Sequence, residues 1–246
     1  MSRLLPLLVL LATAAQALAV EIPDRYWPRW RGPADSGSSV LADCPIKWSQ
    51  DEGHLWKTKL PGIGCSTPVV WGDHILLTST LDGKDLALAF DWNGKPLWNK
   101  EIGDGIPGKH RNGSGSNPSI VTDGERVFAF FKSGNLAGLD FDGNVLWQTN
   151  LQESYGQVKL YWDFGTSPAL TKQDVIVAVM HGGDSYVAAF DQRTGKPRWK
   201  VARNYKVPVE CDHSYATPIV MEQNGKETIL IWGAEHLTSH DAENGR

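Results

Sequence analysis

The segment Ser66-Thr67-Pro68-Val69-Val70 opens a pattern that returns three more times along the chain, each time with proline at its third position. The later copies are Ser116-Asn117-Pro118-Ser119-Ile120, Thr166-Ser167-Pro168-Ala169-Leu170 and Ala216-Thr217-Pro218-Ile219-Val220. Proline cannot donate an amide hydrogen to a sheet, so it is best placed at the first residue of a strand. Because successive prolines are 50 residues apart, the sequence predicts one strand-opening unit repeated four times.

Each copy continues with the same series of features. A β-rich run is followed by a second run that ends in aspartate, and then by a turn closed by glycine, as in Asn93-Gly94 and Asp142-Gly143. Such dipeptides supply the positive φ angles of a tight hairpin. Three of the four copies then reach a tryptophan, at Trp98, Trp147 and Trp199. Four short antiparallel strands in a repeat of this length are typical of a propeller blade, whose outer tryptophan would fill the wedge beside the next blade.

Two of the copies share a more specific pattern. It reads Leu88-Ala89-Phe90-Asp91 with Gly94-Lys95-Pro96-Leu97-Trp98 in the first copy, and Ala188-Ala189-Phe190-Asp191 with Gly195-Lys196-Pro197-Arg198-Trp199 in the third. This pattern resembles the PQQ-like (pyrrolo-quinoline quinone) repeat of exported bacterial β-propellers, which include the propeller subunit of the outer-membrane barrel-assembly machinery. The resemblance implies an all-β fold: a seven- or eight-bladed propeller of four-stranded antiparallel blades, of which about four are present here.

The ends of the chain suggest how it is divided. We expect a signal peptide over residues 1–19, an N-terminal extension over 20–55 and repeats over 56–246. The blades are expected at about 62–103, 114–152, 164–203 and 214–246. The last would be incomplete, because the fourth copy stops before its tryptophan.

Trp56 looks like an outer-strand tryptophan that has no blade of its own before it. Two interpretations follow. The favoured one is an incomplete propeller, and the other is a closed four-bladed ring in which Trp56 completes the fourth blade.

The first residues have the features of a secretory signal. Arg3 precedes an apolar run from Leu4 to Ala15, and Ala17-Leu18-Ala19 is a small-x-small cleavage site. The run is shorter than the roughly 20 residues that span a bilayer, and no later segment is apolar enough to do so. We therefore expect a periplasmic or secreted protein.

The net charge of -4 is not that of a nucleic-acid-binding protein, which needs clustered Lys and Arg.

Three cysteines, Cys44, Cys65 and Cys211, leave at least one thiol unpaired within the chain. A Cys44–Cys65 disulfide stays open as an alternative, and we expect Cys65 and Cys211 to be small buried loop residues.

The loops that precede the innermost strands of a propeller gather on one face, together with the connections between second and third strands. These connections contribute Lys132, His181 with Asp184, and His236. The predicted ligand-binding residues of this face are His110, Arg111, Tyr161, Trp162, Asp163, Asp212 and His213.

Several of these residues have alternative interpretations. His110 and Arg111 could hold an anion, and Trp162 could stack on a planar ring or belong to the core between blades. Asp163 could orient a neighbouring loop instead of doing chemistry. Asp212 and His213 could transfer a proton or bind a metal, although adjacent residues of an extended segment point opposite ways. The whole set could also be ordinary loop chemistry.

Two classes of function are compatible with the repeat. The first is a non-catalytic binding or scaffold propeller of the cell envelope, which engages envelope proteins or a small polar ligand and needs no cofactor. The second is a PQQ-dependent alcohol or sugar dehydrogenase. The resemblance implies that such an enzyme holds its quinone with a stacked tryptophan, an adjacent pair of cysteines, calcium and a catalytic aspartate. No two cysteines are adjacent here, which favours the first class.

Overall fold

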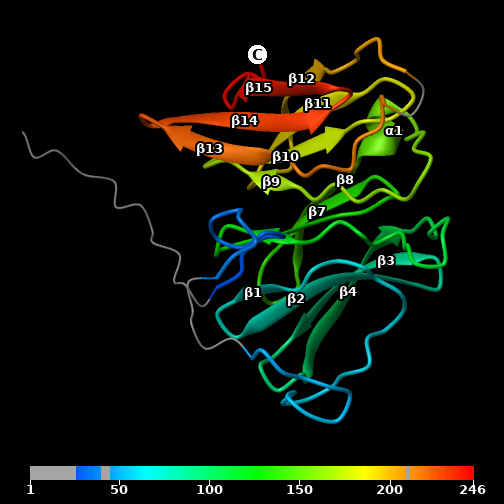
Figure 1. The fold of residues 1–246 in the computed structure, drawn as a ribbon, viewed down its shortest axis with the longest axis vertical. Helices are drawn as coiled ribbons and strands as arrows, with labels where there is room; N and C mark the ends of the chain where they lie inside the picture. Colours follow the sequence, from blue (N-terminus) through cyan, green and yellow to red (C-terminus); the bar gives the residue numbers. More distant parts are fainter. Residues whose placement is uncertain (1–25, 40–44, 209–210) are drawn as a thin grey trace, which may run out of the picture.

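The computed structural model describes residues 26–39, 45–208 and 211–246. The predicted signal peptide and Cys44 lie outside these residues. The described chain forms four antiparallel sheets and one short helix, which confirms the expected all-β class (Figure 1). No helix of this part of the chain is long and apolar enough to cross a membrane.

Three sheets have four strands and the last has three, and each sheet keeps the order of the sequence from its innermost strand outward. The strands and the helix are β1 (Val69–Trp71), β2 (His74–Leu81), β3 (Lys84–Phe90), β4 (Pro96–Asp104); β5 (Val121–Thr122), β6 (Val127–Phe130), β7 (Asn135–Leu139), β8 (Val145–Asn150), α1 (Leu151–Tyr155); β9 (Ala169–Leu170), β10 (Asp174–Val179), β11 (Tyr186–Asp191), β12 (Pro197–Ala202); β13 (Ile219–Gln223), β14 (Lys226–Gly233) and β15 (His236–Asp241).

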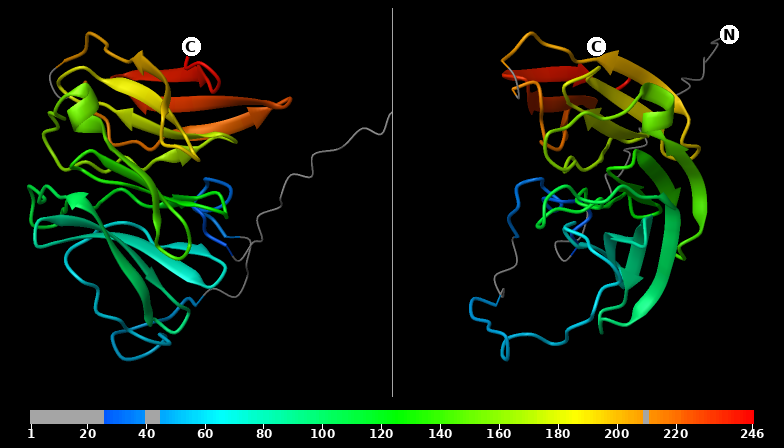
Figure 2. Two further views of the ribbon diagram at one scale, coloured as in Figure 1. Left: turned by 180° about the vertical axis from the view of Figure 1, so that it is seen from behind. Right: turned by 90° about the vertical axis from the view of Figure 1, so that its right-hand side faces the viewer.

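The sheets follow one another along an arc, from the sheet of β1–β4 to the sheet of β13–β15 (Figures 1 and 2). Their innermost strands adjoin in chain order, β1 beside β5, β5 beside β9 and β9 beside β13. Pro68, Pro168 and Pro218 directly precede innermost strands, and Pro118 lies three residues before β5. The proline register of the sequence is therefore the register of the innermost strands.

A belt of hydroxyl groups joins these innermost segments. The amide of Thr67 donates to Ser119 Oγ at 2.9 Å, and the amide of Ser119 donates to Ser167 Oγ at 2.9 Å. The amide of Ser167 donates in turn to Thr217 Oγ1 at 3.1 Å. Each sheet thus supplies a side-chain acceptor for a backbone donor of the sheet before it, which satisfies amides that have no ladder partner.

Apolar side chains fill the space between successive sheets. Because side chains alternate along a strand, Ile176 and Ala178 of β10 face the fourth sheet while Val175 and Val177 face the second. All four are buried. The sheets therefore stack through dry faces, as the blades of a propeller do.

A tryptophan locks each pair of neighbouring sheets at the outer rim. Trp147 of β8 donates its indole hydrogen to the carbonyl of Gln192 at 2.8 Å and lies against Gly195 in the next sheet. Gly195 has φ +67, and a Cβ atom there would lie 2.4 Å from the indole. The equivalent bonds are Trp98 to Phe141 O at 2.8 Å and Trp199 to Ala242 O at 2.9 Å.

Trp56 makes the same contact on the first sheet. Its indole donates to the carbonyl of Trp92 at 2.7 Å and lies against Gly94. It does not complete the sheet of β13–β15, which has three strands among the described residues. The closed four-bladed ring is therefore not formed in this structure.

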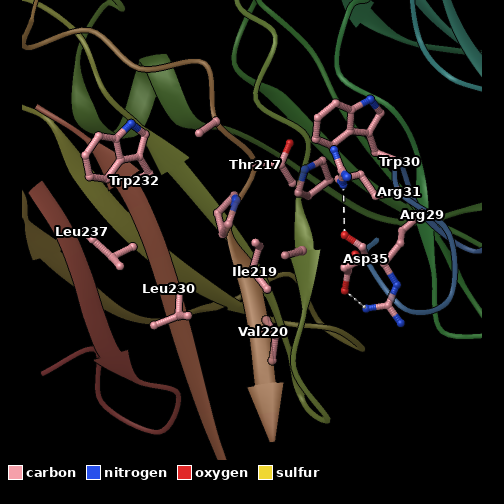
Figure 3. Close-up of a pocket in the computed structure, with 14 residues that line it drawn as sticks. Arg29, Trp30, Arg31, Asp35, Thr217, Ile219, Val220, Leu230, Trp232 and Leu237 are labelled. Carbon is pink, nitrogen blue, oxygen red and sulfur yellow. Dashed lines mark hydrogen bonds and ion pairs between the residues drawn. The ribbon is translucent and has the colours of Figure 1, made fainter. Parts of the chain in front are cut away.

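The N-terminal extension crosses the inner side of the first two sheets. Trp27 pairs with Val70 of β1 as an isolated bridge, and the carbonyl of Pro28 accepts the amide of Thr122 in β5 at 3.0 Å. The chain then turns toward β13, where Trp30 and Trp232 stand on opposite sides of an apolar pocket of about 400 Å³ (Figure 3).

Candidate functional site

The first group of predicted site residues is organised around Asp163. Its carboxylate accepts the amide of Lys109 at 2.8 Å and the amide of His110 at 3.3 Å, both from the loop between β4 and β5. It also pairs with Lys132 Nζ, in the turn between β6 and β7, at 2.6 Å. Lys132 Nζ donates further to the carbonyl of Pro107 at 2.6 Å. One carboxylate thus ties three separate loops together.

The surroundings of Asp163 keep it ionised. Burial by itself would raise the pKa of this carboxyl, but the hydrogen bonds from Lys132, Lys109 and His110 outweigh burial and lower it. Gly113 also packs against the carboxylate, because a Cβ there would lie 2.3 Å from Asp163 Oδ2. A charged, fully engaged carboxylate in this position holds the neighbouring loops in place.

Aromatic side chains cover the outside of this anchored region. Tyr161 and Trp162 are 58% and 54% exposed, and their rings meet edge to face at 4.9 Å. His110 approaches Trp162 edge to face at 6.1 Å, and the Trp162 amide donates to Tyr215 Oη at 3.3 Å. We call His110, Tyr161, Trp162 and Tyr215 the aromatic patch. The alternative that placed Trp162 in the core between blades is wrong, because its ring is exposed.

The backbone beneath the patch is fixed as well. Lys109 Nζ donates to the carbonyls of Leu160 and Tyr161, which crosslinks the two loops a second time. Arg111 is exposed beside His110, and its side chain has no ion pair within the described part of the chain. The patch therefore presents exposed rings on a hydrogen-bonded base, with the cationic Arg111 beside it.

The second group of predicted site residues adjoins this patch, because His213 lies two residues before Tyr215. Asp212 Oδ1 and His213 Nε2 are 3.6 Å from each other, in a turn that begins where Cys211 N donates to Pro208 O. The expectation that the two side chains point opposite ways is wrong, because this segment turns instead of running extended. Asp212 lines a polar pocket of about 420 Å³ together with His181 and Arg203.

His181 is fixed within this second group. Its Nδ1 accepts the amide of Lys159 at 3.0 Å, and burial lowers the pKa of the imidazole. Burial therefore favours the neutral ring, with the proton on the other nitrogen. This group can present hydrogen-bonding atoms to a polar ligand.

Arg203 is a buried residue that the sequence did not reveal. It is 1% exposed and donates to the carbonyls of Gly233, Ile231 and His236 and to Thr238 Oγ1. These bonds join the end of β12 to the fourth sheet. Its role could be found only from the structure, because no other copy of the repeat carries arginine at a comparable place.

The cysteines differ from expectation. Cys65 is exposed and Cys211 is partly exposed, and both are free thiols, so the expectation that they are buried is wrong. Within the described ranges, no three His, Cys, Asp or Glu side chains are grouped to hold a metal ion.

The chain belongs to the family of PQQ-like repeat propellers described as Outer membrane protein assembly factor BamB, whose model matches residues 46–214. Its fold is similar to that of the quinohemoprotein alcohol dehydrogenase from Comamonas testosteroni, with a TM-score of 0.62 and 15% identity over 90% of this chain and 40% of that chain.

Two further solved structures match more loosely. BamB from Moraxella catarrhalis matches with a TM-score of 0.49 and 19% identity over 75% of this chain and 52% of that one. A europium-containing methanol dehydrogenase matches with a TM-score of 0.42 and 19% identity, over 56% of this chain and 24% of that one. This chain thus spans about half the length of these proteins or less. No curated protein matches the chain.

Proposed function

We propose that this protein is a non-catalytic binding or scaffold propeller of the cell envelope, which engages a protein partner through the aromatic patch. The supporting observation is the pairing of exposed rings with a rigid base. Tyr161 and Trp162 are more than half exposed, while the backbone under them is held by Asp163, Lys109 and Lys132.

Exposed aromatic residues on a preorganised surface are typical of binding hot spots. Tyrosine, tryptophan and arginine dominate such spots, and a rigid surface loses little entropy on binding. Arg111 adds the third of these residue types at the edge of the patch. The family's description as an outer membrane protein assembly factor supports an envelope location and a protein partner. A periplasmic position, with the signal peptide at residues 1–19, belongs to the same proposal.

The test uses site-specific photo-crosslinking in the cells that produce the protein. A photoreactive phenylalanine analogue replaces Tyr161 in the patch, and in a parallel variant it replaces Lys196, which is exposed in the turn between β11 and β12 on the other rim. We expect a discrete protein adduct from position 161 and none from position 196. Equal adducts from both positions, or none from position 161, would contradict the proposal.

The identified partner is then titrated against purified variants. Trp162→Ala is expected to weaken binding by about thirtyfold or more, which corresponds to a hot spot of about 2 kcal/mol. Trp48→Ala removes another exposed tryptophan, which is 72% exposed in the N-terminal extension, and is expected to leave the affinity unchanged. Equal affinities of the two variants would show that the patch is not the binding surface.

A further inference from the structure

Asp85 is a fully buried acid at the contact between the first two sheets. It lies on β3 and is 0% exposed. Its Oδ2 accepts from the hydroxyl of Ser133, in the turn that joins β6 to β7, and from Nδ2 of Asn135, the first residue of β7, at 2.9 Å. Oδ1 has no hydrogen-bond partner and faces Gly105, where a Cβ would lie 2.7 Å away. The carboxyl thus bridges two sheets with only one of its oxygens satisfied.

Among the residues that the structure describes, no cation pairs with this carboxyl. On β4 the charged neighbour is Asp104, whose carboxylate is held by Lys84 at 2.8 Å. On the side of the second sheet, the groups that contact it are the neutral Ser133 and Asn135. The charged residue of that turn, Lys132, is paired with Asp163. Ionising Asp85 would therefore leave a negative charge buried beside another acid.

Burial accordingly raises the pKa of Asp85 to about 6, against the hydrogen bonds from Ser133 and Asn135 and with a smaller contribution from Asp104. Its pKa is therefore raised above the ordinary value of 3.8, so the folded state favours the neutral acid. The stability that this site contributes is greatest below the ordinary pKa, and it is lost as the pH rises through about 6.

We propose that Asp85 is a proton-controlled latch between the first two sheets, closed when its carboxyl is neutral and weakened when it ionises, and that it controls the order of the loops under the aromatic patch. The proposed control of the loops under the aromatic patch rests on the proposed function of that patch, whereas the proposed latch at Asp85 does not.

The connection from the latch to the patch is a short chain of contacts. Ser133 shares its turn with Lys132, which holds Asp163 through its amine, and Asn135 begins β7 directly after that turn. The amide of Lys132 also donates to the carbonyl of Gly115, within the loop between β4 and β5 that carries His110. A turn released from Asp85 therefore loosens the residues that fix Lys109 and His110.

The size of the effect follows from proton linkage. With a pKa of about 6 in the closed latch and an ordinary value of 3.8 in the open one, opening is favoured about tenfold more at pH 7.5 than at pH 5. The protection of loop amides against hydrogen exchange, corrected for the intrinsic pH dependence of exchange, should fall by the same factor.

The experiment measures exchange of the amides of residues 108–113 in the isolated protein at pH 5 and pH 7.5. Protection is expected to fall about tenfold in the wild type and to be independent of pH in Asp85→Asn, which mimics the neutral acid. Asp174→Asn is the matched control, because Asp174 is also buried but lies in the third sheet, where it pairs with Arg198. This control should keep the wild-type profile, and equal profiles for Asp85→Asn and the wild type would overturn the proposal.

A direct titration covers the case in which Asp85→Asn does not fold. The carboxyl carbon resonance of Asp85 in the wild-type protein is followed by NMR from pH 4 to pH 8. A midpoint well above 4 supports the latch, and a carboxyl that is already ionised at pH 4.5 refutes it. Neither measurement needs a partner, so a failure of the latch is distinguishable from a failure of the crosslinking test of the patch.

Discussion

The contact between Trp147 and Gly195 offers the sharpest test of how neighbouring sheets are held. Trp147 is 9% exposed, and its indole donates to the carbonyl of Gln192, a residue that is 4% exposed. Replacing a buried tryptophan with alanine costs about 3–5 kcal/mol, which includes the cavity. The buried Gln192 carbonyl also loses its donor, which adds a further cost of about 1–3 kcal/mol to the free energy of unfolding. We therefore expect Trp147→Ala to lower the free energy of unfolding by at least about 3 kcal/mol.

Gly195→Ala probes the same contact from the other side. Alanine at φ +67 costs about 1–2 kcal/mol for its backbone conformation alone, and its Cβ would lie 2.4 Å from the indole. Displacing the ring adds an overpacking cost of about 1–3 kcal/mol. Gly225→Ala is the matched control, because Gly225 has φ +76 and open space around its Cβ position. Gly225→Ala should therefore lower the free energy of unfolding by the backbone cost only, with no overpacking cost.

The two changes should not be additive. Once Trp147 is alanine, the new Cβ at position 195 has no ring to displace, so the double variant should be more stable than the sum of the single effects by about 1 kcal/mol or more. Urea unfolding followed by far-ultraviolet circular dichroism measures the free energy of unfolding of the wild type, the two single variants, the double variant and the Gly225→Ala control. A Trp147→Ala cost below about 1 kcal/mol, or full additivity with Gly195→Ala, would refute this account of the contact.

Two further predictions concern single buried groups. Because the hydrogen bonds to Asp163 lower its folded pKa, its contribution to stability is present above the ordinary pKa of 3.8 and is lost as the pH falls through the folded value. Asp163→Asn should therefore be less stable than the wild type at pH 7, with a smaller difference below pH 3; a constant difference in acid titrations of thermal unfolding would contradict this. Arg203→Met should lower the unfolding free energy by about 3 kcal/mol or more, because it removes the buried guanidinium and its hydrogen bonds to the carbonyls of Gly233, Ile231 and His236. A chemical denaturation midpoint equal to that of the wild type would show that water replaces the guanidinium.

The sheets could be predicted from the sequence because their signals are local. The prolines at positions 68, 118, 168 and 218 and the glycine-closed turns each act on the backbone within a few residues of themselves. The tryptophans were large enough, and regular enough in spacing, to predict a place between blades.

The site could be predicted only in part. The burial of Asp163 and the exposure of Trp162 depend on which neighbouring loop covers which side chain. Asp85 and Arg203 depend on partners about 30 to 50 residues away in the adjacent sheet. The turn at Asp212 was missed because an extended segment was assumed before Pro218, whereas Cys211 closes a turn on Pro208.

Hydrogen exchange of assigned indole groups tests the central claim most directly, namely that docked tryptophans join the sheets into a platform that displays Trp162. The indole hydrogens of Trp98, Trp147 and Trp199 are hydrogen-bonded to the next sheet, whereas the ring of Trp162 is 54% exposed. The account predicts slow exchange at the first three and unprotected exchange at Trp162. Rapid exchange at the docked tryptophans, or protection of Trp162 in the isolated protein, would contradict it.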